Sequence, residues 1–168
     1  MKWKIAAVAA ALALRFVMTS LAANAQTPDC KSAPALPSDT LTSANQPAAL
    51  GSATLTPGHP VTVTLHPSAK VAYAMPPEKS GTDVSYGGLL GASVSDAATY
   101  AVSLGSGGWI DMVKDGAPVA STVHGHGDAC SVFRKMVSFP LNAGRYVIQI
   151  SANPAATVAV MVSKVSTP

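Results

Sequence analysis

The residues most suited to chemistry lie in one short segment, where four potential metal ligands occupy alternate positions: His124, His126, Asp128 and Cys130. In an extended chain, side chains at alternate positions project from the same face. Imidazole, carboxylate and thiolate groups on one face suit a borderline cation such as zinc or copper(II). One hypothesis is therefore a metal carrier or small metal-dependent oxidoreductase that binds Zn or Cu through His124 and His126. Because glycines separate these residues, the pattern is also typical of an exposed, flexible turn that binds no metal.

The two cysteines of the chain give Cys130 a second interpretation. An even number of cysteines in an exported protein favours pairing, so Cys30 and Cys130 are predicted to form a disulfide. The bridge would close a loop of roughly 100 residues, which the chain-entropy treatment values at ~4–5 kcal/mol. The alternative leaves Cys130 as a free thiolate that could bind the metal.

A second group of candidate residues surrounds Trp109, which shares a predicted strand face with Asp111. A buried carboxylate needs a partner, so one interpretation of Asp111 is a polar contact that anchors its strand. The functional alternative is a ligand-binding site of Trp109, Asp111 and Tyr100, in which Trp109 with Tyr100 or Tyr86 forms a platform that holds a sugar by aromatic stacking.

Arg134 and Lys135 form the only adjacent basic pair in the chain. They lie in an alternating segment, so one of them must share a face with apolar residues unless a bulge intervenes. The pair is interpreted either as an anion site or as an edge position whose charged end reaches solvent.

No catalytic signature accompanies these residues. The chain has no Gly-x-Ser-x-Gly elbow between a strand and a helix. Its glycine-rich segment at 105–108 precedes no helix N-terminus that could receive a phosphate. The eight acidic residues are scattered and give no clear carboxylate pair for glycoside hydrolysis. We therefore expect a protein that is not an enzyme.

The first 25 residues predict a cleaved signal helix. Lys2 and Lys4 precede an apolar run, and Ala23-Asn24-Ala25 supplies small residues for signal peptidase. Arg15 interrupts the run, which is shorter than the ~20 residues of a spanning helix. Three of the eleven basic residues lie in this segment, whereas all eight acidic residues follow it, so the remaining chain is neutral. These features predict a periplasmic or secreted protein with no stable membrane span after cleavage, and they exclude nucleic acid as a partner.

Residues 26–50 are rich in Pro, Ala, Ser and Thr without a sustained apolar period, which predicts a flexible segment. From 51 to 168, apolar residues recur at every second position, as in strands. The predicted strands are 61–65, 71–75, 90–94, 100–104, 109–114, 119–123, 136–141, 146–150 and 157–165. Asp115-Gly116 is a hairpin signal. About eight or nine short strands predict an all-β domain, an antiparallel β-sandwich or jelly roll.

Tyr100 and Tyr146 each open a predicted strand after a similar polar turn. A tyrosine that enters a core buries its ring while its hydroxyl reaches a backbone partner. We expect both residues to adopt this arrangement at two similar corners of the sandwich.

Residues 139–150, Phe-Pro-Leu-Asn-Ala-Gly-Arg-Tyr-Val-Ile-Gln-Ile, resemble the closing strands of bacterial pre-peptidase C-terminal domains. In these small secreted β-sandwiches, a strand, an Ala-Gly turn and a Tyr-led strand recur, and residues 112–116 are similar to the preceding strand and turn. The resemblance covers about residues 95–165. It implies a secreted β-sandwich of a kind that accompanies proteases or binds extracellular polymers. The chain departs from the family by its His-rich loop and by lacking the usual run of acidic residues.

Three further blocks resemble short exported proteins of proteobacteria: residues 77–79 with 86–90, residues 109–111, and residues 124–135. Such proteins often carry the label homogentisate 1,2-dioxygenase. That iron enzyme uses a His/Glu/His ligand set, whereas the single glutamate here, Glu78, is far in sequence from the histidine pair. We therefore expect a non-catalytic binding or structural module of the cell envelope. Its partner would be an envelope protein bound at a sheet edge, or a small ligand or polysaccharide.

Overall fold

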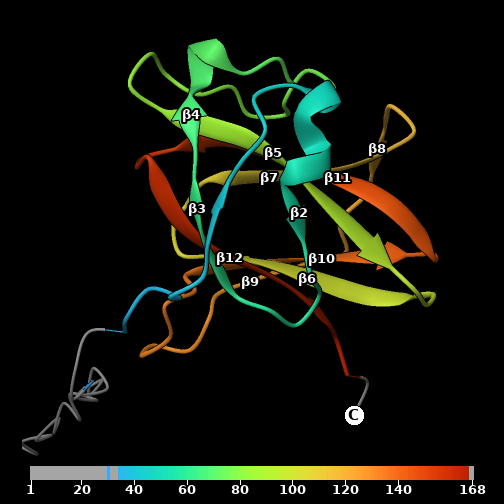
Figure 1. Cartoon of the computed structure of the whole chain (residues 1–168). Coiled ribbons are helices and arrows are strands. Elements are labelled where there is room, and N and C mark those ends of the chain that lie inside the picture. The colour runs from blue at the N-terminus through green and yellow to red at the C-terminus, as the bar shows by residue number, and fades with distance from the viewer. Residues whose placement is uncertain (1–29, 31–33, 167–168) are drawn as a thin grey trace, which may run out of the picture.

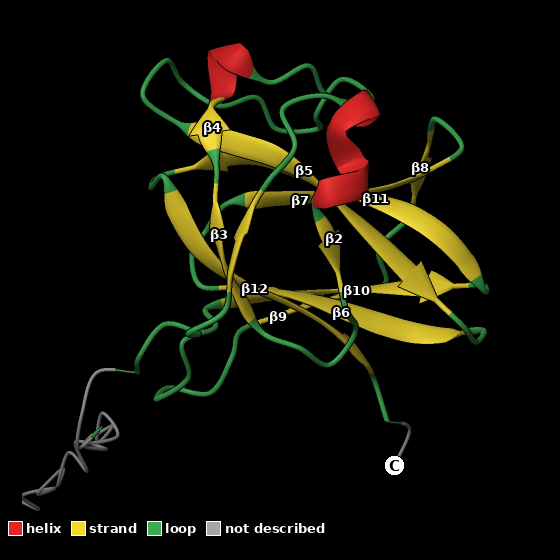
Figure 2. Ribbon diagram, in the orientation of Figure 1, coloured by secondary structure: helices red, strands yellow, loops and turns green. Residues whose placement is uncertain are grey.

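Two β-sheets of six strands each face one another (Figure 1). The computed structural model describes Cys30 and residues 34–166, so the predicted signal segment lies outside the described residues. Figure 2 shows that strands dominate the described fold and that its helical parts are short and lie on one side. The predicted all-β sandwich is confirmed.

The first sheet runs from edge strand β1 to edge strand β9. Its strands, in spatial order, are β1 (Thr40–Thr42), β3 (Val61–Thr64), β12 (Thr157–Lys164), β6 (Ala98–Leu104), β10 (Lys135–Leu141) and β9 (Val123–Gly125).

The second sheet has β11 in the middle of its strand order. Its strands, in spatial order, are β2 (Thr54–Leu55), β5 (Tyr86–Val94), β11 (Gly144–Asn153), β7 (Trp109–Lys114) and β8 (Ala117–Val119), and β4 (His66–Pro67) also pairs with β5. Two short 3-10 helices, η1 (Pro47–Ser52) and η2 (Ser68–Lys70), complete the fold.

Twelve strands are present in the described chain, more than the eight or nine expected. Five of them have two or three residues, too few for an alternating pattern to be recognised. The pairings are antiparallel except for β1 with β3 and β2 with β5, which are parallel, so the expectation of a purely antiparallel sandwich is corrected at these two edges.

The hydrophobic core lies between the sheets and is built from alternate residues of each strand. On β11, Tyr146, Ile148 and Ile150 belong to the core, and Ile148 and Ile150 have no exposed surface. Full burial of such a side chain contributes about 1.5–3 kcal/mol. The intervening residues of β11, including Arg145 and Gln149, therefore lie on the outer face of the second sheet.

Three turns predicted from the sequence adopt the expected geometry. Tyr100 and Tyr146 are buried, and each hydroxyl donates to the carbonyl four residues earlier, on Asp96 (3.4 Å) and Asn142 (2.9 Å). Asp115-Gly116 joins β7 to β8, with φ of 51° and 77°, the positive values that a two-residue hairpin turn requires.

The predicted strand at 71–75 is wrong. Residues 71–85, the crossing segment, contain no strand and pass over the outer face of the second sheet. The backbone N–H of Met75 donates to Gln149 Oε1 (3.3 Å), and the carbonyl of Lys79 accepts from Ser151 Oγ (2.8 Å). Apolar residues alternate in this segment although its backbone forms no strand. The segment packs on the face of a sheet instead.

Two other predicted boundaries also change. The expected strand at 119–123 is divided between β8 in one sheet and β9 in the other. The second half of the predicted flexible segment at 26–50 belongs to the fold, because β1 pairs with β3 and Ala44 bridges to Leu89. Buried Ser43 and Ala44 explain why this polar stretch is held in place.

Cys30 and Cys130 form a disulfide with a Cα–Cα distance of 5.5 Å, which confirms the predicted pairing. The bond attaches Cys30 to the loop that connects β9 to β10. Across the part of the chain that the structure describes, no helix has the length and apolar character needed to cross a membrane.

Candidate functional site

The histidine segment is extended only over β9, where His124 lies opposite Val137 of β10. The strand ends at Gly125, so the alternation does not continue to Asp128. His124 Nε2 lies 2.9 Å from Ser121 Oγ, and His126 Nδ1 lies 3.1 Å from the carbonyl oxygen of Arg134. Both imidazoles therefore already bind protein groups.

The predicted metal ligands do not assemble into a site. Cys130 is excluded because its sulfur is bonded to Cys30. Among residues 34–166 and Cys30, no group of three or more His, Cys, Asp or Glu side chains gathers as metal ligands would. His124, His126 and Asp128 thus give the zinc or copper hypothesis no ligand set of that size.

Ser121 and His124 form a hydrogen-bonded pair that the sequence analysis missed. A hydroxyl hydrogen-bonded to an imidazole is the arrangement of a nucleophile and its general base. Both residues are exposed, and no carboxylate within the described chain hydrogen-bonds to the other imidazole nitrogen of His124. The pair lacks the group that orients the base in a catalytic triad.

Asp111 is the centre of a polar cluster on the outer face of the second sheet. Its carboxylate accepts from the indole N–H of Trp109 (2.9 Å), from Gln149 Nε2 (3.2 Å) and from the backbone N–H of Glu78 (3.3 Å). Gln149 has no exposed surface. The expectation of an anchoring contact is met, and the cluster attaches the crossing segment to the sheet.

Tyr100 does not join Trp109 in the predicted sugar-stacking platform, and Tyr86, the alternative partner, lies on β5, which β11 separates from β7. Tyr100 is buried in the first sheet, whereas Trp109 belongs to the second. Lysines also surround the indole, because Lys135 Nζ lies 4.6 Å and Lys79 Nζ lies 6.0 Å from its ring centroid. Trp109 therefore engages cations rather than presenting a face beside Tyr100.

Two groups near this cluster have displaced pKa values. Burial lowers the pKa of Lys135, Lys79 lowers it further, and Asp111 partly opposes them. Burial raises the pKa of Tyr73, the Ser68 hydroxyl partly opposes this, and Asp111 adds to it. The Tyr73 hydroxyl is buried without a hydrogen-bond partner among the described residues.

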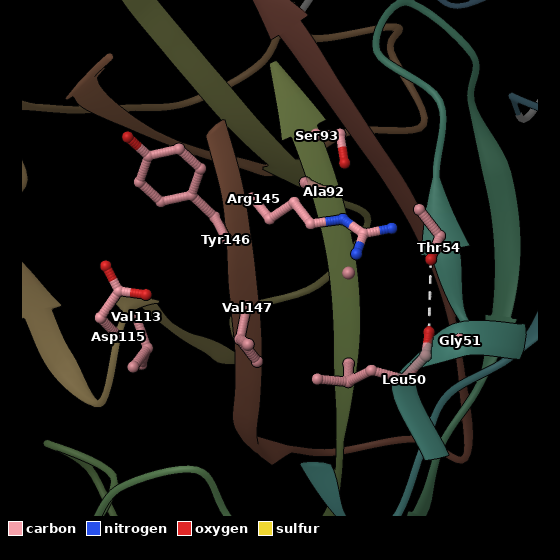
Figure 3. A pocket seen from close by; sticks show the side chains of 11 residues that line it. Leu50, Gly51, Thr54, Ala92, Ser93, Val113, Asp115, Arg145, Tyr146 and Val147 are labelled. Carbon is pink, nitrogen blue, oxygen red and sulfur yellow. Dashed lines mark hydrogen bonds between the residues drawn. The ribbon is translucent and has the colours of Figure 1, made fainter. Parts of the chain in front are cut away.

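A groove of about 300 Å³ lies on the outer face of the second sheet, between η1 and the turn from β7 to β8 (Figure 3). Its residues come from five separate elements and are Leu50, Gly51, Thr54, Gly91, Ala92, Ser93, Val113, Asp115, Arg145, Tyr146 and Val147. Such a volume is at the lower end of the range for small-molecule sites. We call it the outer groove.

The guanidinium of Arg145 is the group in the outer groove that is best suited to bind a ligand. Its exposed side chain extends toward Thr54, on the side away from Asp115 (Figure 3). It forms no hydrogen bond or ion pair with any part of the chain that the structure describes. Leu50 and Val147 offer apolar surface beside it. A free guanidinium over apolar residues is suited to a carboxylate with an apolar body.

The outer groove could not be predicted from the sequence because no local pattern brings its residues together. Arg145 alternates with core residues of β11, which indicates an outward position. Nothing in the sequence places η1 beside that position.

No protein-family model and no curated protein matches the chain.

Proposed function

We propose that this protein is an exported, non-catalytic binding module that holds a small organic acid in the outer groove. The observation that carries the proposal is the exposed guanidinium of Arg145, which has no partner in the described chain and adjoins apolar residues. A guanidinium presents its N–H donors in a fork that matches a carboxylate, which favours a bidentate pair.

The groove also limits the size and polarity of the ligand. About 300 Å³ suits a small molecule rather than a polymer segment. Leu50, Val113 and Val147 favour an apolar body, whereas Ser93 and Thr54 offer hydroxyls to its polar end. A small aromatic or branched carboxylic acid meets these requirements.

Export to the periplasm or the medium is part of the proposal. The disulfide supports an oxidising compartment, and the basic start, apolar run and small residues at 23–25 support a signal peptide. The two tyrosine corners fit the resemblance to secreted pre-peptidase C-terminal domains. In this setting the module would bind its acid outside the cytoplasm.

The test is a titration of the oxidised protein, beginning at residue 26, with benzoate and with its neutral amide, benzamide. The amide keeps the ring but lacks the charge, so we expect benzoate to bind more tightly. In ¹H–¹⁵N spectra, the amides of Gly91 and Val147 should shift and saturate.

Arg145→Gln should weaken benzoate binding by about tenfold or more, because a charge-assisted hydrogen bond is lost. Lys164→Gln is the control, since Lys164 is exposed and lies on β12 of the first sheet, whereas the groove lies on the second sheet. Equal affinity for benzoate and benzamide, or an unchanged affinity in Arg145→Gln, would overturn the proposal.

A further inference from the structure

A second hollow lies where β9 and β10 meet the loop between β6 and β7. Its volume is about 470 Å³, and it shares no lining residue with the outer groove. The titratable side chains that line it are all basic: His124, His126, Arg134 and Lys135. None of the described carboxylates lines it. We call it the basic hollow.

Lys135 is held at the wall of the basic hollow. Its Nζ donates to the carbonyl of Gly108 (3.0 Å) and lies over the Trp109 ring. An ammonium group has three donors, so the bond to Gly108 leaves two for a ligand. Because burial disfavours the charge of Lys135, an anion at this wall would offset that cost.

Arg134 adds further donors beside His126. Arg134 Nη1 donates to the carbonyl of Ala129 (3.3 Å), which leaves most of its five N–H donors available. The carbonyl of Arg134 accepts from His126 Nδ1 (3.1 Å), so that nitrogen carries the hydrogen, and Nε2 donates to a ligand only when the imidazole is protonated. Donors from β10 and from the loop that precedes it thus line one hollow.

We propose that the basic hollow binds a phosphate-type oxyanion, either free phosphate or the phosphate group of a small monoester. Guanidinium and ammonium groups beside the imidazoles repel a metal cation and attract a dianion. Charge-assisted hydrogen bonds to several oxygens would then hold the ligand. His124 and His126, first considered as metal ligands, become part of an anion site.

The test is a pair of titrations of the ¹⁵N-labelled, oxidised protein at constant ionic strength, one with inorganic phosphate and one with glycerol 3-phosphate. We expect the amides of Gly107 and Gly125, which line the hollow, to shift and saturate. Equal affinity for the two compounds would support free phosphate as the ligand, whereas tighter binding of glycerol 3-phosphate would support a monoester. Shifts that do not saturate, or that spread over the whole surface, would overturn the proposal.

Variants add a second readout. Arg134→Gln and Lys135→Gln should each weaken phosphate binding by about tenfold or more, and Lys164→Gln should leave it unchanged. Unchanged affinity in both hollow variants would overturn the proposal. If either variant fails to fold, the position of the wild-type shifts still decides. The proposed function is judged separately, because benzoate reports on Gly91 and Val147 instead.

Discussion

Replacing Asp111 by asparagine tests whether one carboxylate holds the crossing segment on the second sheet. Oδ1 accepts from Trp109 Nε1, and Oδ2 accepts from Gln149 Nε2 and from the N–H of Glu78. Asparagine has one acceptor oxygen and one donor nitrogen. Whichever way its amide lies, the nitrogen faces at least one N–H donor. The better orientation keeps two hydrogen bonds and loses the one from Trp109.

The magnitude follows from this count. A hydrogen bond to a charged group contributes about 1.5–3 kcal/mol, and the two remaining bonds lose their charge assistance. We therefore expect Asp111→Asn to lower the free energy of unfolding by about 2–3 kcal/mol. Domains are stable by only roughly 5–15 kcal/mol, so the change is readily measured.

The assay is urea unfolding of the oxidised protein that begins at residue 26, followed by tryptophan fluorescence. Trp109 is the only tryptophan after residue 25, so it reports directly on the cluster. The control is Asp96→Asn, since Asp96 pairs with Lys164 at the surface (3.4 Å) and should lose less than about 1 kcal/mol. A loss in Asp111→Asn no larger than in the control would refute this account of the crossing segment.

Three further changes test other parts of the fold. Replacing Cys30 and Cys130 together by serine should cost up to about 4.7 kcal/mol in urea unfolding, because the bond closes a loop of about 100 residues. Tyr73→Phe removes a buried hydroxyl without a described partner, so it should leave stability unchanged or raise it by up to about 1 kcal/mol. Burial raises the pKa of Tyr73 in the folded protein, so ionisation of this tyrosine destabilises the fold at high pH. The stability linked to its neutral form is fully present below the ordinary tyrosine pKa and is lost as pH rises through the folded pKa. Thermal unfolding above pH 10 should therefore show a weaker pH dependence in Tyr73→Phe. Gly87→Ala would place Cβ against the Tyr73 hydroxyl and 2.7 Å from the carbonyl oxygen of Ile150, so thermal unfolding should show a loss of about 1–3 kcal/mol.

Each of these predictions has a contrary outcome. Equal urea midpoints for oxidised and cysteine-free protein would show that the bridge does not constrain the unfolded chain. A loss of more than about 1 kcal/mol in Tyr73→Phe would show that the hydroxyl has a partner after all. A neutral Gly87→Ala would show that β5 can move away from its neighbours.

The longer strands were predictable because one face of each is buried. β7 matches its predicted range of 109–114, and β10, β11 and β12 differ from theirs at the ends alone. The disulfide was also predictable, since a chain with two cysteines allows one intramolecular pairing. Local chemistry was sufficient in these cases.

The sequence could not show which distant segments lie side by side on the sheets. Val71, Tyr73 and Met75 alternate like a strand, yet their segment lies on a sheet face and pairs with neither β7 nor β11. Likewise, the alternating pattern places Arg145 on one face of a strand, while its position in a groove depends on η1, nearly a hundred residues away in sequence. Short strands and side-chain contacts between distant segments leave no periodic signal.

The attachment of the crossing segment has an evolutionary consequence. Strand register is set by backbone pairing, and this segment is attached to β7 and β11 through Asp111, Gln149 and Ser151 instead. Insertions or deletions in the segment leave the register of the neighbouring strands unchanged, provided that a few of its peptide groups still form hydrogen bonds with those three side chains. Homologous chains should therefore differ in length here more freely than in the hairpins, and could reshape this side of the molecule while the sandwich stays the same.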